Sequence, residues 1–305
     1  MQHDLIIVTG PTATGKTRFA VELAYMLNGE IISADSRQVF RGMDLGTGKD
    51  LSDYVIGDKQ IPFHLIDIID AGEKYNVYRF QHDFLKAYDL IRNRNKIPIL
   101  CGGTGLYIES VVNRYQMPDV PENKKLRSEL ANKSLEELTE ILSGLKKMHN
   151  ITDIDTRNRA IRAIEIATFE KDNPESDINF PVLNCVIFGV AFDRAIIRQR
   201  ITERLQQRID AGMIDEIRRL IEKGVDPDVL ISYGLEYKFT TWFLQNKLSY
   251  SEYFSLLNTA IHQFAKRQVT WFRRMERNGI KINWIDGNLS MPEKIDGAKS
   301  ILEIL

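Results

Sequence analysis

Apolar and polar residues along the first hundred positions predict strands that alternate with helices. Residues 5–8 are a short apolar run, and apolar side chains recur at helical spacing over residues 16–27. A second apolar run, EIISADS, ends in polar residues, and a helix predicted over about residues 77–92 precedes a third run, KIPILCGGTG. Parallel strands joined by helices form an α/β sheet, and ligands bind at the carboxyl ends of its strands.

The pattern changes in the middle of the chain. Residues 113–179 are charged and helical in period and carry no strand signal, which indicates an inserted helical module. A last apolar strand follows at residues 181–192, and helical periodicity dominates residues 203–221 and 250–277. We therefore predict an α/β core of residues 1–112 and 180–305, with a helical insert of residues 113–179.

Composition is that of an ordinary globular protein. The 305 residues are 43% apolar, which is enough to bury a core. The apolar runs are too short to span a bilayer, and no basic leader precedes the first strand. Cys101 and Cys185 provide neither a disulfide framework nor a zinc-binding C-x-x-C pair. We expect a cytoplasmic monomer with no membrane partner.

The segment between the first strand and the first helix, TGPTATGKTRFA, fits the phosphate-binding pattern G-x-x-x-x-G-K-[ST]. Successive backbone N–H groups and a helix N-terminus there face a phosphate, Lys16 reaches the terminal phosphates, and Thr17 can hold Mg²⁺. This loop usually binds ATP or GTP, but the motif alone also suits another diphosphate. The residues assigned to the nucleotide or diphosphate are Gly10, Pro11, Thr12, Ala13, Thr14, Gly15, Lys16 and Thr17.

Three further polar residues follow predicted strands, and each has a plain structural alternative. Asp35 is either a reactive carboxylate or a helix-cap or turn residue. Thr104, in CGGTG, offers a hydroxyl or belongs to a simple strand-to-helix turn. Asp67, in FHLIDIID, resembles the Mg²⁺-binding acid that ends a Walker B strand, although residues 66–69 also fit an edge strand.

Basic residues gather in three helical segments of a chain whose net charge is only −1. One such helix is typical of a solvated face, but three of them indicate a patch for a polyanion, with aromatic side chains on which bases stack. The segments contain Arg157, Arg159 and Arg162; Arg194, Arg198, Arg200, Arg204 and Arg208; and Lys266, Arg267, Arg273 and Arg274 with Phe264, Trp271 and Phe272.

Taken in order, these motifs resemble the tRNA dimethylallyltransferases, also called tRNA isopentenyltransferases. The resemblance covers about residues 5–274 and rests on GPTATGKT, ISADSRQVFRGMDLGTGK, PFHLID, GGTGLY, NRAIRAIE, GMIDEIRRLI and AKRQVTWFR. It implies a P-loop NTPase-like parallel sheet flanked by helices, with a small inserted helical domain. The implied enzyme transfers a dimethylallyl group from dimethylallyl diphosphate to N6 of adenosine 37, beside the anticodon of tRNA, with Mg²⁺ as cofactor.

The resemblance also implies roles for individual residues. The loop from Gly10 to Thr17 falls on the segment that binds the diphosphate of the donor, and Lys16 and Thr104 support the leaving group. Asp35 falls on the general base, and the helical insert on a clamp for the anticodon stem-loop. The residues that fall on tRNA contacts are Asp35, Ser36, Arg37, Gln38, Thr104, Asn158, Arg159, Ala160, Ile161, Arg162, Lys266, Arg267 and Arg273.

The chain departs from the family pattern on the acceptor side. It has GTGKD at residues 46–50 where the family has GTAKP, a shorter run HNITDIDTRN before the insert arginines, and ISYGLEYKF in place of GYKE. The rival interpretations are an isopentenyltransferase that alkylates free AMP, ADP or ATP, a P-loop kinase of a small metabolite, and a non-catalytic nucleic-acid-binding protein. The arginine-rich segments favour tRNA over a free nucleotide.

Overall fold

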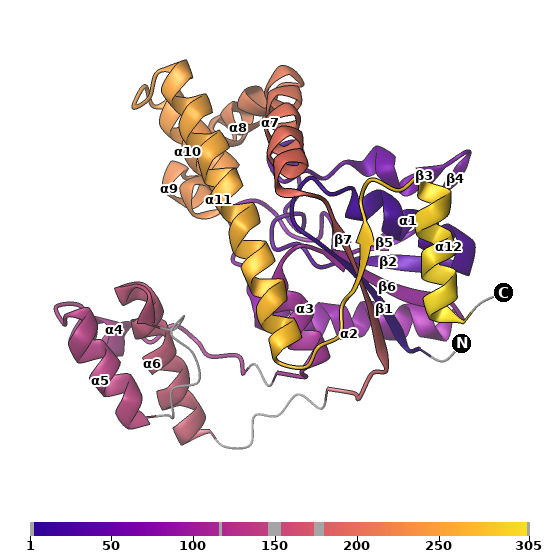
Figure 1. Ribbon diagram of the computed structural model, residues 1–305. Helices are drawn as coiled ribbons and strands as arrows, with labels where there is room; N and C mark the ends of the chain where they lie inside the picture. The colour runs from indigo at the N-terminus through magenta and orange to yellow at the C-terminus, as the bar shows by residue number, and fades with distance from the viewer. Residues whose placement is uncertain (1–2, 116–117, 146–153, 174–179, 304–305) are drawn as a thin grey trace. The chain divides into compact units, whose positions relative to one another are not determined.

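A computed structural model describes residues 3–115, 118–145, 154–173 and 180–303 (Figure 1). The chain divides into two compact units, one made of residues 1–114 and 182–305 and the other of residues 115–181. The limits predicted for the insert, 113 and 179, are close to this division, although residue 179 lies outside the described residues.

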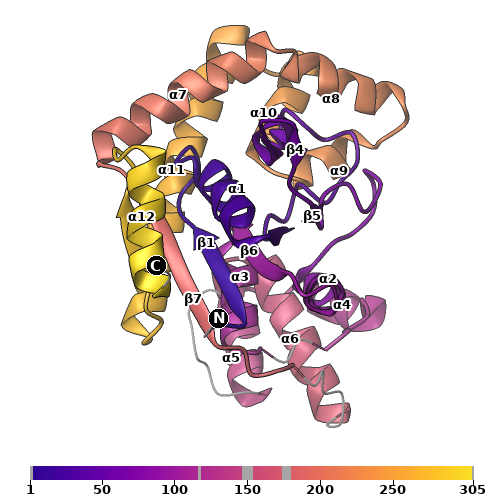
Figure 2. The same cartoon turned by 90° about the vertical axis from the view of Figure 1, so that its right-hand side faces the viewer.

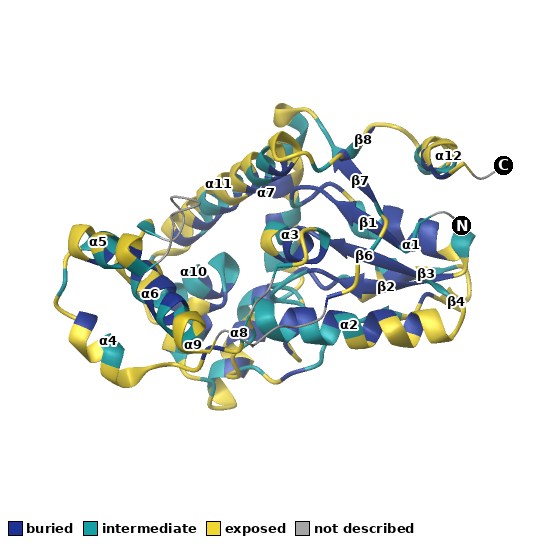
Figure 3. Ribbon diagram, turned by 90° about the horizontal axis from the view of Figure 1, so that it is seen from below, coloured by how far each residue is buried: buried dark blue, intermediate teal, exposed yellow. Residues whose placement is uncertain are grey.

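A six-stranded parallel sheet forms the centre of the larger unit and confirms the predicted α/β class. Its strands, in spatial order, are β5 (Phe63–His64), β2 (Gly29–Ser33), β6 (Ile97–Gly102), β1 (Leu5–Thr9), β7 (Cys185–Ala191) and β8 (Asn283–Asp286). Strands β1 and β2 are buried along their whole length, as Figure 3 shows in dark blue, because helices cover both faces. The register pairs Thr9 with Gly102 and Ser33 with Cys101, so the loops after β1, β2 and β6 begin side by side.

Helices pack on each face of this sheet (Figure 1). The helices α1 (Lys16–Leu27) and α12 (Met291–Leu302) contact each other and bury apolar side chains such as Phe19 and Leu302 with the strands. The helices α2 (Val77–Asn93) and α3 (Gly105–Val112) cover the other face, where Phe80 stacks on Tyr107 at 4.1 Å between ring centroids. A short 3₁₀ helix (Leu51–Tyr54) and the hairpin β3 (Val55–Ile56) and β4 (Lys59–Gln60) pack near α1.

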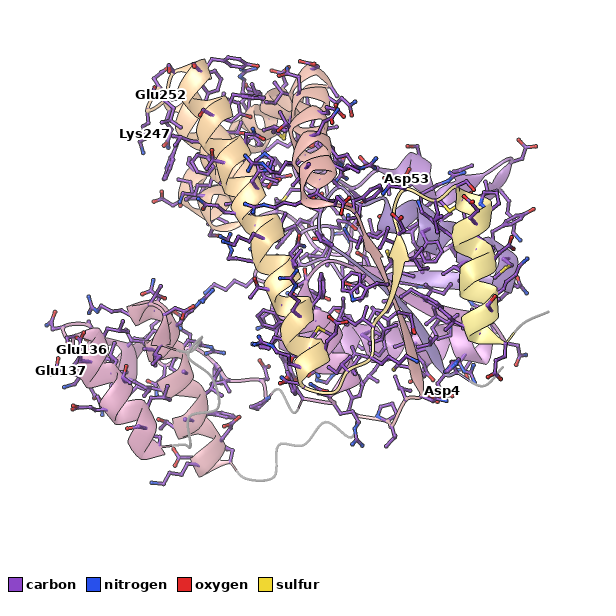
Figure 4. The ribbon with its side chains drawn as sticks, in the orientation of Figure 1. Asp4, Asp53, Glu136, Glu137, Lys247 and Glu252 are labelled. Atoms are coloured by element: carbon purple, nitrogen blue, oxygen red, sulfur yellow. The ribbon has the colours of Figure 1, made fainter. Side chains whose placement is uncertain are left out.

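Five more helices form a second apolar cluster beyond the carboxyl ends of the strands (Figure 2). They are α7 (Arg194–Asp210), α8 (Met213–Glu222), α9 (Pro227–Ser232), α10 (Leu235–Leu244) and α11 (Tyr250–Arg277). Helix α11 begins at a capping box in which Ser249 and Glu252 bond each other's backbone. Figure 4 labels Glu252. Its 28 residues are long enough to join this cluster to α3 beside the sheet.

The smaller unit is helical, as its periodicity predicts. It contains α4 (Lys124–Leu130), α5 (Leu135–Leu145) and α6 (Arg157–Asp172) around a core that includes Leu138, Leu142 and Ile164. Leu138 and Leu142 are separated by four residues, so they lie on the same face of α5 and pack against α6.

The structure differs from the sequence prediction at three places along the chain. The helix predicted over 203–221 is two helices, because Gly212 adopts φ +100° between α7 and α8. Strand β8 and helix α12 have no counterpart among the predicted elements. The edge strand expected at 66–69 is instead β5, Phe63–His64, with only an isolated bridge between Ile69 and Phe40.

Candidate active site

A cavity of about 340 Å³ opens at the carboxyl ends of β1, β2 and β6. The glycine loop, the segments after β2 and β6, and residues of α7, α10 and α11 line it, so the sheet and the C-terminal helical cluster build it together. It contains Lys16, Thr17, Asp35, Ser36, Arg37, Gln38, Thr104 and Arg267 from the predicted site. The fold thus brings the glycine loop, Asp35 and Thr104 to one sheet edge, as the sequence predicts, and adds Arg267 from α11.

The glycine loop has the geometry that a phosphate cradle needs. Gly10 adopts φ +148°, and a Cβ atom there would lie 2.6 Å from the carbonyl oxygen of Val190, so a larger residue is excluded. Gly15, at φ +75°, precedes the first turn of α1, so the N–H groups of that turn point toward the cavity side of the loop. The Lys16 amine lies 3.4 Å from the carbonyl oxygen of Pro11 and lines the cavity.

Asp35 and Thr104 are held together by backbone contacts between their two loops. The N–H of Ser36 donates to the Thr104 hydroxyl at 3.3 Å, and the N–H of Thr104 donates to the carbonyl of Ala34 at 3.3 Å. The N–H of Arg37 donates to Oδ1 of Asp35 at 2.8 Å, which fixes the orientation of the carboxylate. A carboxylate and a hydroxyl therefore face one cavity from neighbouring strands.

Gln268 ties these loops to α11. Its Oε1 accepts the N–H of Thr12 at 2.9 Å, and its Nε2 donates to the carbonyl of Gly103 at 2.9 Å. Gln268 is 8% exposed, and its amide both accepts and donates a hydrogen bond. It therefore holds the glycine loop and the Gly103 turn at a fixed separation. In the sequence, only the charged and aromatic neighbours of Gln268 indicate a role for this segment.

Two arginines of α7 also line the cavity, although the sequence had indicated only a basic face. Arg204 and Arg208 are four residues apart, so they project from one face of the helix. The Nη2 atom of Arg204 lies 2.8 Å from Oδ2 of Asp50, and Nη2 of Arg208 lies 3.9 Å from the same oxygen. The i, i+4 spacing was the signal available in the sequence, but nothing local showed which face would meet the glycine loop.

Cations dominate the electrostatics of this cavity. Burial lowers the pKa of Lys16, and the positive charges of Arg204 and Arg208 act in the same direction. Burial likewise lowers the pKa of Arg208 to about 10, with Arg204 again contributing. Burial raises the pKa of Glu236, which lies across the cavity on α10, although Arg208 opposes that shift. Such a site favours an anionic ligand that can neutralise several cations at once.

A second cavity of about 400 Å³ lies against the same glycine loop. It shares Lys16, Thr17 and Arg204 with the first cavity, and Asp53, labelled in Figure 4, contributes to its wall. The glycine loop is therefore accessible from two sides. No helix within the described ranges is long and apolar enough to cross a membrane.

Two family sequence models match this chain. The sequence model described as IPP transferase matches residues 38–275, and the model described as isopentenyl transferase matches residues 3–67.

The chain belongs to the IPP transferase family.

Two relatives and one solved structure are similar to this chain over nearly their full length. A tRNA dimethylallyltransferase 2 from Bacteroides fragilis is 58% identical over 301 residues, which are 99% of this chain and 98% of that protein. Another from Phocaeicola vulgatus is 54% identical over 301 residues, covering 99% and 98%. The crystal structure of the full-length tRNA isopentenylpyrophosphate transferase from Bacillus halodurans has a TM-score of 0.72 at 32% identity, covering 99% of this chain and 96% of that one.

The arginine-bearing segment of the IPP transferase insert is only partly exposed. Asn158 and Arg159 are exposed at the start of α6, and Arg159 pairs with Asp155 at 2.5 Å. Ala160 is fully buried and belongs to the core of the smaller unit, against which the half-buried Ile161 packs. Arg162 is tied internally to Glu165 Oε2 at 2.9 Å and to the carbonyl of Val120 at 2.9 Å. Any side-chain contact of this segment with RNA is thus restricted to its polar members.

The basic and aromatic residues of α11 divide in the same way. Lys266, Arg267 and Arg273 are exposed, and Arg267 stacks on the exposed Phe264 at the cavity. The expectation that Phe272 offers its ring to a base is wrong, because Phe272 is fully buried. Trp271 packs closely against Gly105 and carries Arg274 over its ring at 4.0 Å, while Arg274 also bonds Glu109 at 2.5 Å.

Asp67 pairs with a buried lysine and does not lie beside the phosphate loop. Its carboxylate accepts from the ammonium of Lys49, whose side chain is fully buried, and Asp67 lines neither of the two cavities described above. The Lys49 ammonium also bonds Asp44 at 2.8 Å and the carbonyl of Phe40 at 2.9 Å. Asp67 therefore compensates a buried lysine, which leaves Thr17 as the predicted Mg²⁺ ligand that lines the cavity.

Proposed function

We propose that this IPP transferase transfers a dimethylallyl group from dimethylallyl diphosphate to N6 of adenosine 37 in the anticodon loop of tRNA. The observation that supports it best is the convergence of the glycine loop, Asp35, Thr104 and the arginines of α7 on one cavity. The names of the relatives support the same activity, since proteins 54–58% identical over nearly the whole chain are named tRNA dimethylallyltransferases. Diphosphate is the second product.

The glycine loop and α7 provide the donor side of this proposal. The N–H groups of the first turn of α1, the Lys16 ammonium and the Arg204 guanidinium lie where the diphosphate would bind, since Gly15, Lys16, Thr17 and Arg204 line the cavities at the loop. As the bond between C1 and the bridging oxygen breaks, negative charge grows on the diphosphate. Preorganised N–H groups and cations oppose that charge without reorganising, which lowers the barrier. No nucleoside triphosphate is consumed.

Thr17 fits a Mg²⁺ ion bound together with the diphosphate. Among the residues that the structure describes, no group of three or more His, Cys, Asp and Glu side chains is placed to hold a metal. The Thr17 hydroxyl lines the cavity and would hold Mg²⁺ together with oxygens of the substrate and water, the ligands that Mg²⁺ prefers. When bound there, Mg²⁺ supplies additional positive charge at the leaving diphosphate.

Asp35 provides the acceptor side. The lone pair of an adenine N6 is delocalised into the ring, so N6 attacks C1 effectively only if a base accepts its proton as the bond forms. The Asp35 carboxylate lines the cavity and accepts the Arg37 N–H, which supports its assignment as that base. General-base assistance of this kind contributes about 10²- to 10⁴-fold. The Thr104 hydroxyl, beside Ser36, has a proton to donate to the leaving diphosphate.

An adenine stacked in its loop cannot enter a cavity of this size, so the base must leave the stack and be held there. Gln38 is suited to the base edge because its amide is already oriented by Ser33 at 3.0 Å and by the carbonyl of Gly48 at 3.2 Å. Arg267 and Phe264 offer a cation and an exposed ring at the same opening. Asn158 and Arg159 of the insert, and Lys266 and Arg273 of α11, are the exposed candidates for phosphate contacts.

Transfer of label from dimethylallyl diphosphate tests this proposal. Purified protein with Mg²⁺ is given labelled donor and either undermodified tRNA or AMP, and we expect label in tRNA alone. Label in AMP but not tRNA would identify an adenylate isopentenyltransferase. ATP consumption without alkyl transfer would identify a kinase instead.

A substitution at Asp35 tests the mechanism separately from binding. Asp35→Asn should lower kcat about 10²- to 10⁴-fold while the Kd for tRNA changes little, because the proton is accepted only as the new bond forms. Equal losses in kcat and in tRNA affinity would assign Asp35 a binding role.

A further inference from the structure

Asp50 is the acid closest to the cavity arginines, and its surroundings differ from those of an ordinary surface acid. Its Oδ2 atom lies 2.8 Å from Nη2 of Arg204 and 3.9 Å from Nη2 of Arg208. One carboxylate oxygen thus contacts two guanidinium groups from successive turns of α7. The single hydrogen bond to Arg204 uses one of its five N–H donors and leaves the others for a ligand.

The loop that carries Asp50 is fixed from two directions. The Glu216 carboxylate of α8 accepts the N–H groups of Leu45 at 2.6 Å and Gly46 at 3.2 Å. The adjacent residue, Lys49, is anchored by its buried ammonium to Asp44 and Phe40. Because its neighbours are held in this way, Asp50 acts as a fixed point against which the longer arginine side chains are ordered.

The charges around Asp50 depend on one another. Burial alone would raise the pKa of Asp50, but the charge and hydrogen bond of Arg204, together with Arg208, bring it below its ordinary value. The Nη2 atom of Arg208 is buried and has no hydrogen-bond partner among the described residues. Arg204 lowers the pKa of both Arg208 and Lys16 by repulsion, whereas Glu236 and Asp50 raise the pKa of Arg208.

We propose that Asp50 is a positioning residue that holds Arg204 and Arg208 toward the glycine loop, so that both meet the diphosphate of the donor. The inference rests on the proposed function for the identity of the donor. Asp50 itself touches neither the transferred carbon nor the base. It acts by keeping two long cationic side chains in place, which reduces the ordering that diphosphate binding would otherwise require.

Inorganic diphosphate is the probe for this role. In titration calorimetry with Mg²⁺, Asp50→Asn should raise the Kd for diphosphate about tenfold, because a charge-assisted hydrogen bond that orders Arg204 is weakened. Asp58→Asn is the matched control, since it removes the same charge from an exposed position in the turn of the β3–β4 hairpin. An unchanged or lower Kd in Asp50→Asn would overturn the proposal, and a lower one would identify Asp50 as a competitor of the ligand.

Two further measurements separate positioning from a loss of structure. In steady-state assays, Asp50→Asn should raise the KM for the donor with little change in kcat, and Asp50→Glu should recover part of the loss. In the background Arg204→Gln, the Asp50 substitution should have a much smaller effect, because the two residues act as one unit. Full additivity would contradict the proposal. Diphosphate binding needs no alkyl transfer, so failure of the proposed function leaves this test intact.

Discussion

Two arginine clusters differ in how fully the protein's own carboxylates pair with them. In the smaller unit, the buried Glu165 accepts from Arg127 at 2.7 and 2.8 Å and from Arg162 at 2.9 Å, and it also accepts the N–H of Asn123 at 2.9 Å. In the larger unit, Arg204 and Arg208 share one oxygen of the partly exposed Asp50. The first cluster is satisfied internally, whereas the second keeps donors for a ligand.

The number of carboxylate contacts per arginine explains this difference. Burial would raise the pKa of Glu165, yet hydrogen bonds from Arg127, Arg162 and Asn123 lower it to about 2. Those guanidinium groups are thereby committed to the protein's own acid and stabilise the insert. A run of arginines therefore indicates an RNA-binding or phosphate-binding surface only where the protein lacks acids to match it.

The largest expected effect is on catalysis, after a substitution in the cluster of Arg204 and Arg208. Arg204→Gln should lower kcat/KM for the donor about 10²-fold, because a cation facing the developing charge is removed. Label transfer at varied donor concentration measures it, with tRNA affinity by filter binding as the control. A loss of tRNA affinity equal to the loss in kcat/KM would mean that Arg204 contacts RNA instead of the donor.

A substitution in the Glu165 cluster should lower the stability of the insert. Glu165→Gln leaves two arginines without their buried counter-charge and should lower the free energy of unfolding of the insert by about 3 kcal/mol. Hydrogen exchange of the α6 amides measures it locally. Glu140→Gln, on the exposed side of α5, is the matched control and should change exchange little. Intact α6 protection in Glu165→Gln would show that the cluster is not a stabilising one.

Low pH should weaken the Glu165 cluster, and this is the next largest expected effect. The pKa of Glu165 is lowered in the folded insert to about 2, so its contribution is fully present above its ordinary pKa and is lost as the pH falls toward 2. We expect α6 protection to decline between about pH 4.5 and pH 2, by about 2 kcal/mol. Glu165→Gln should remove this pH dependence from α6. A slope that persists in this variant would have another origin.

The smallest effect is expected at an exposed arginine of the insert. Arg159 is exposed and pairs with Asp155, so Arg159→Gln should weaken tRNA binding only about two- to fivefold. The substitution should also reduce the salt dependence of log Kd by about one phosphate contact. Filter binding across a salt series measures both. Lys171→Gln, at the far end of α6, is the control. No change in the salt slope would leave Arg159 without a phosphate contact.

Much of the α/β core could be predicted from the sequence because its signals are local. The glycine loop, the helix of residues 16–27 and the polar ends of β2 and β6 each depend on residues close together in the chain. Parallel pairing then brings Asp35 and Thr104 to one edge without further information. The short strand β8 was missed because Asn283–Asp286 alternates in exposure and carries little apolar signal.

The remaining site residues could not be found in this way, because their roles depend on distant partners. Gln268 is a neutral residue within a basic segment, and its bond to Thr12 spans 256 residues. The proposed role of Asp50 depends on its bond to Arg204, which is 154 residues away in the sequence. Likewise, the sequence presents Arg162 as an exposed cation, and only the pairing with Glu165 shows that it is held inside its own unit.

The amide of Gln268 has a consequence for the synthesis of the protein. Thr12, in the glycine loop, leaves the ribosome early. Its N–H can donate to Gln268 only after α11 has been synthesised. A nascent chain that ends before residue 268 therefore carries the complete phosphate-binding motif without the side chain that sets its spacing from Gly103. The motif is not a self-sufficient module, and truncated products should be unable to capture and retain the donor.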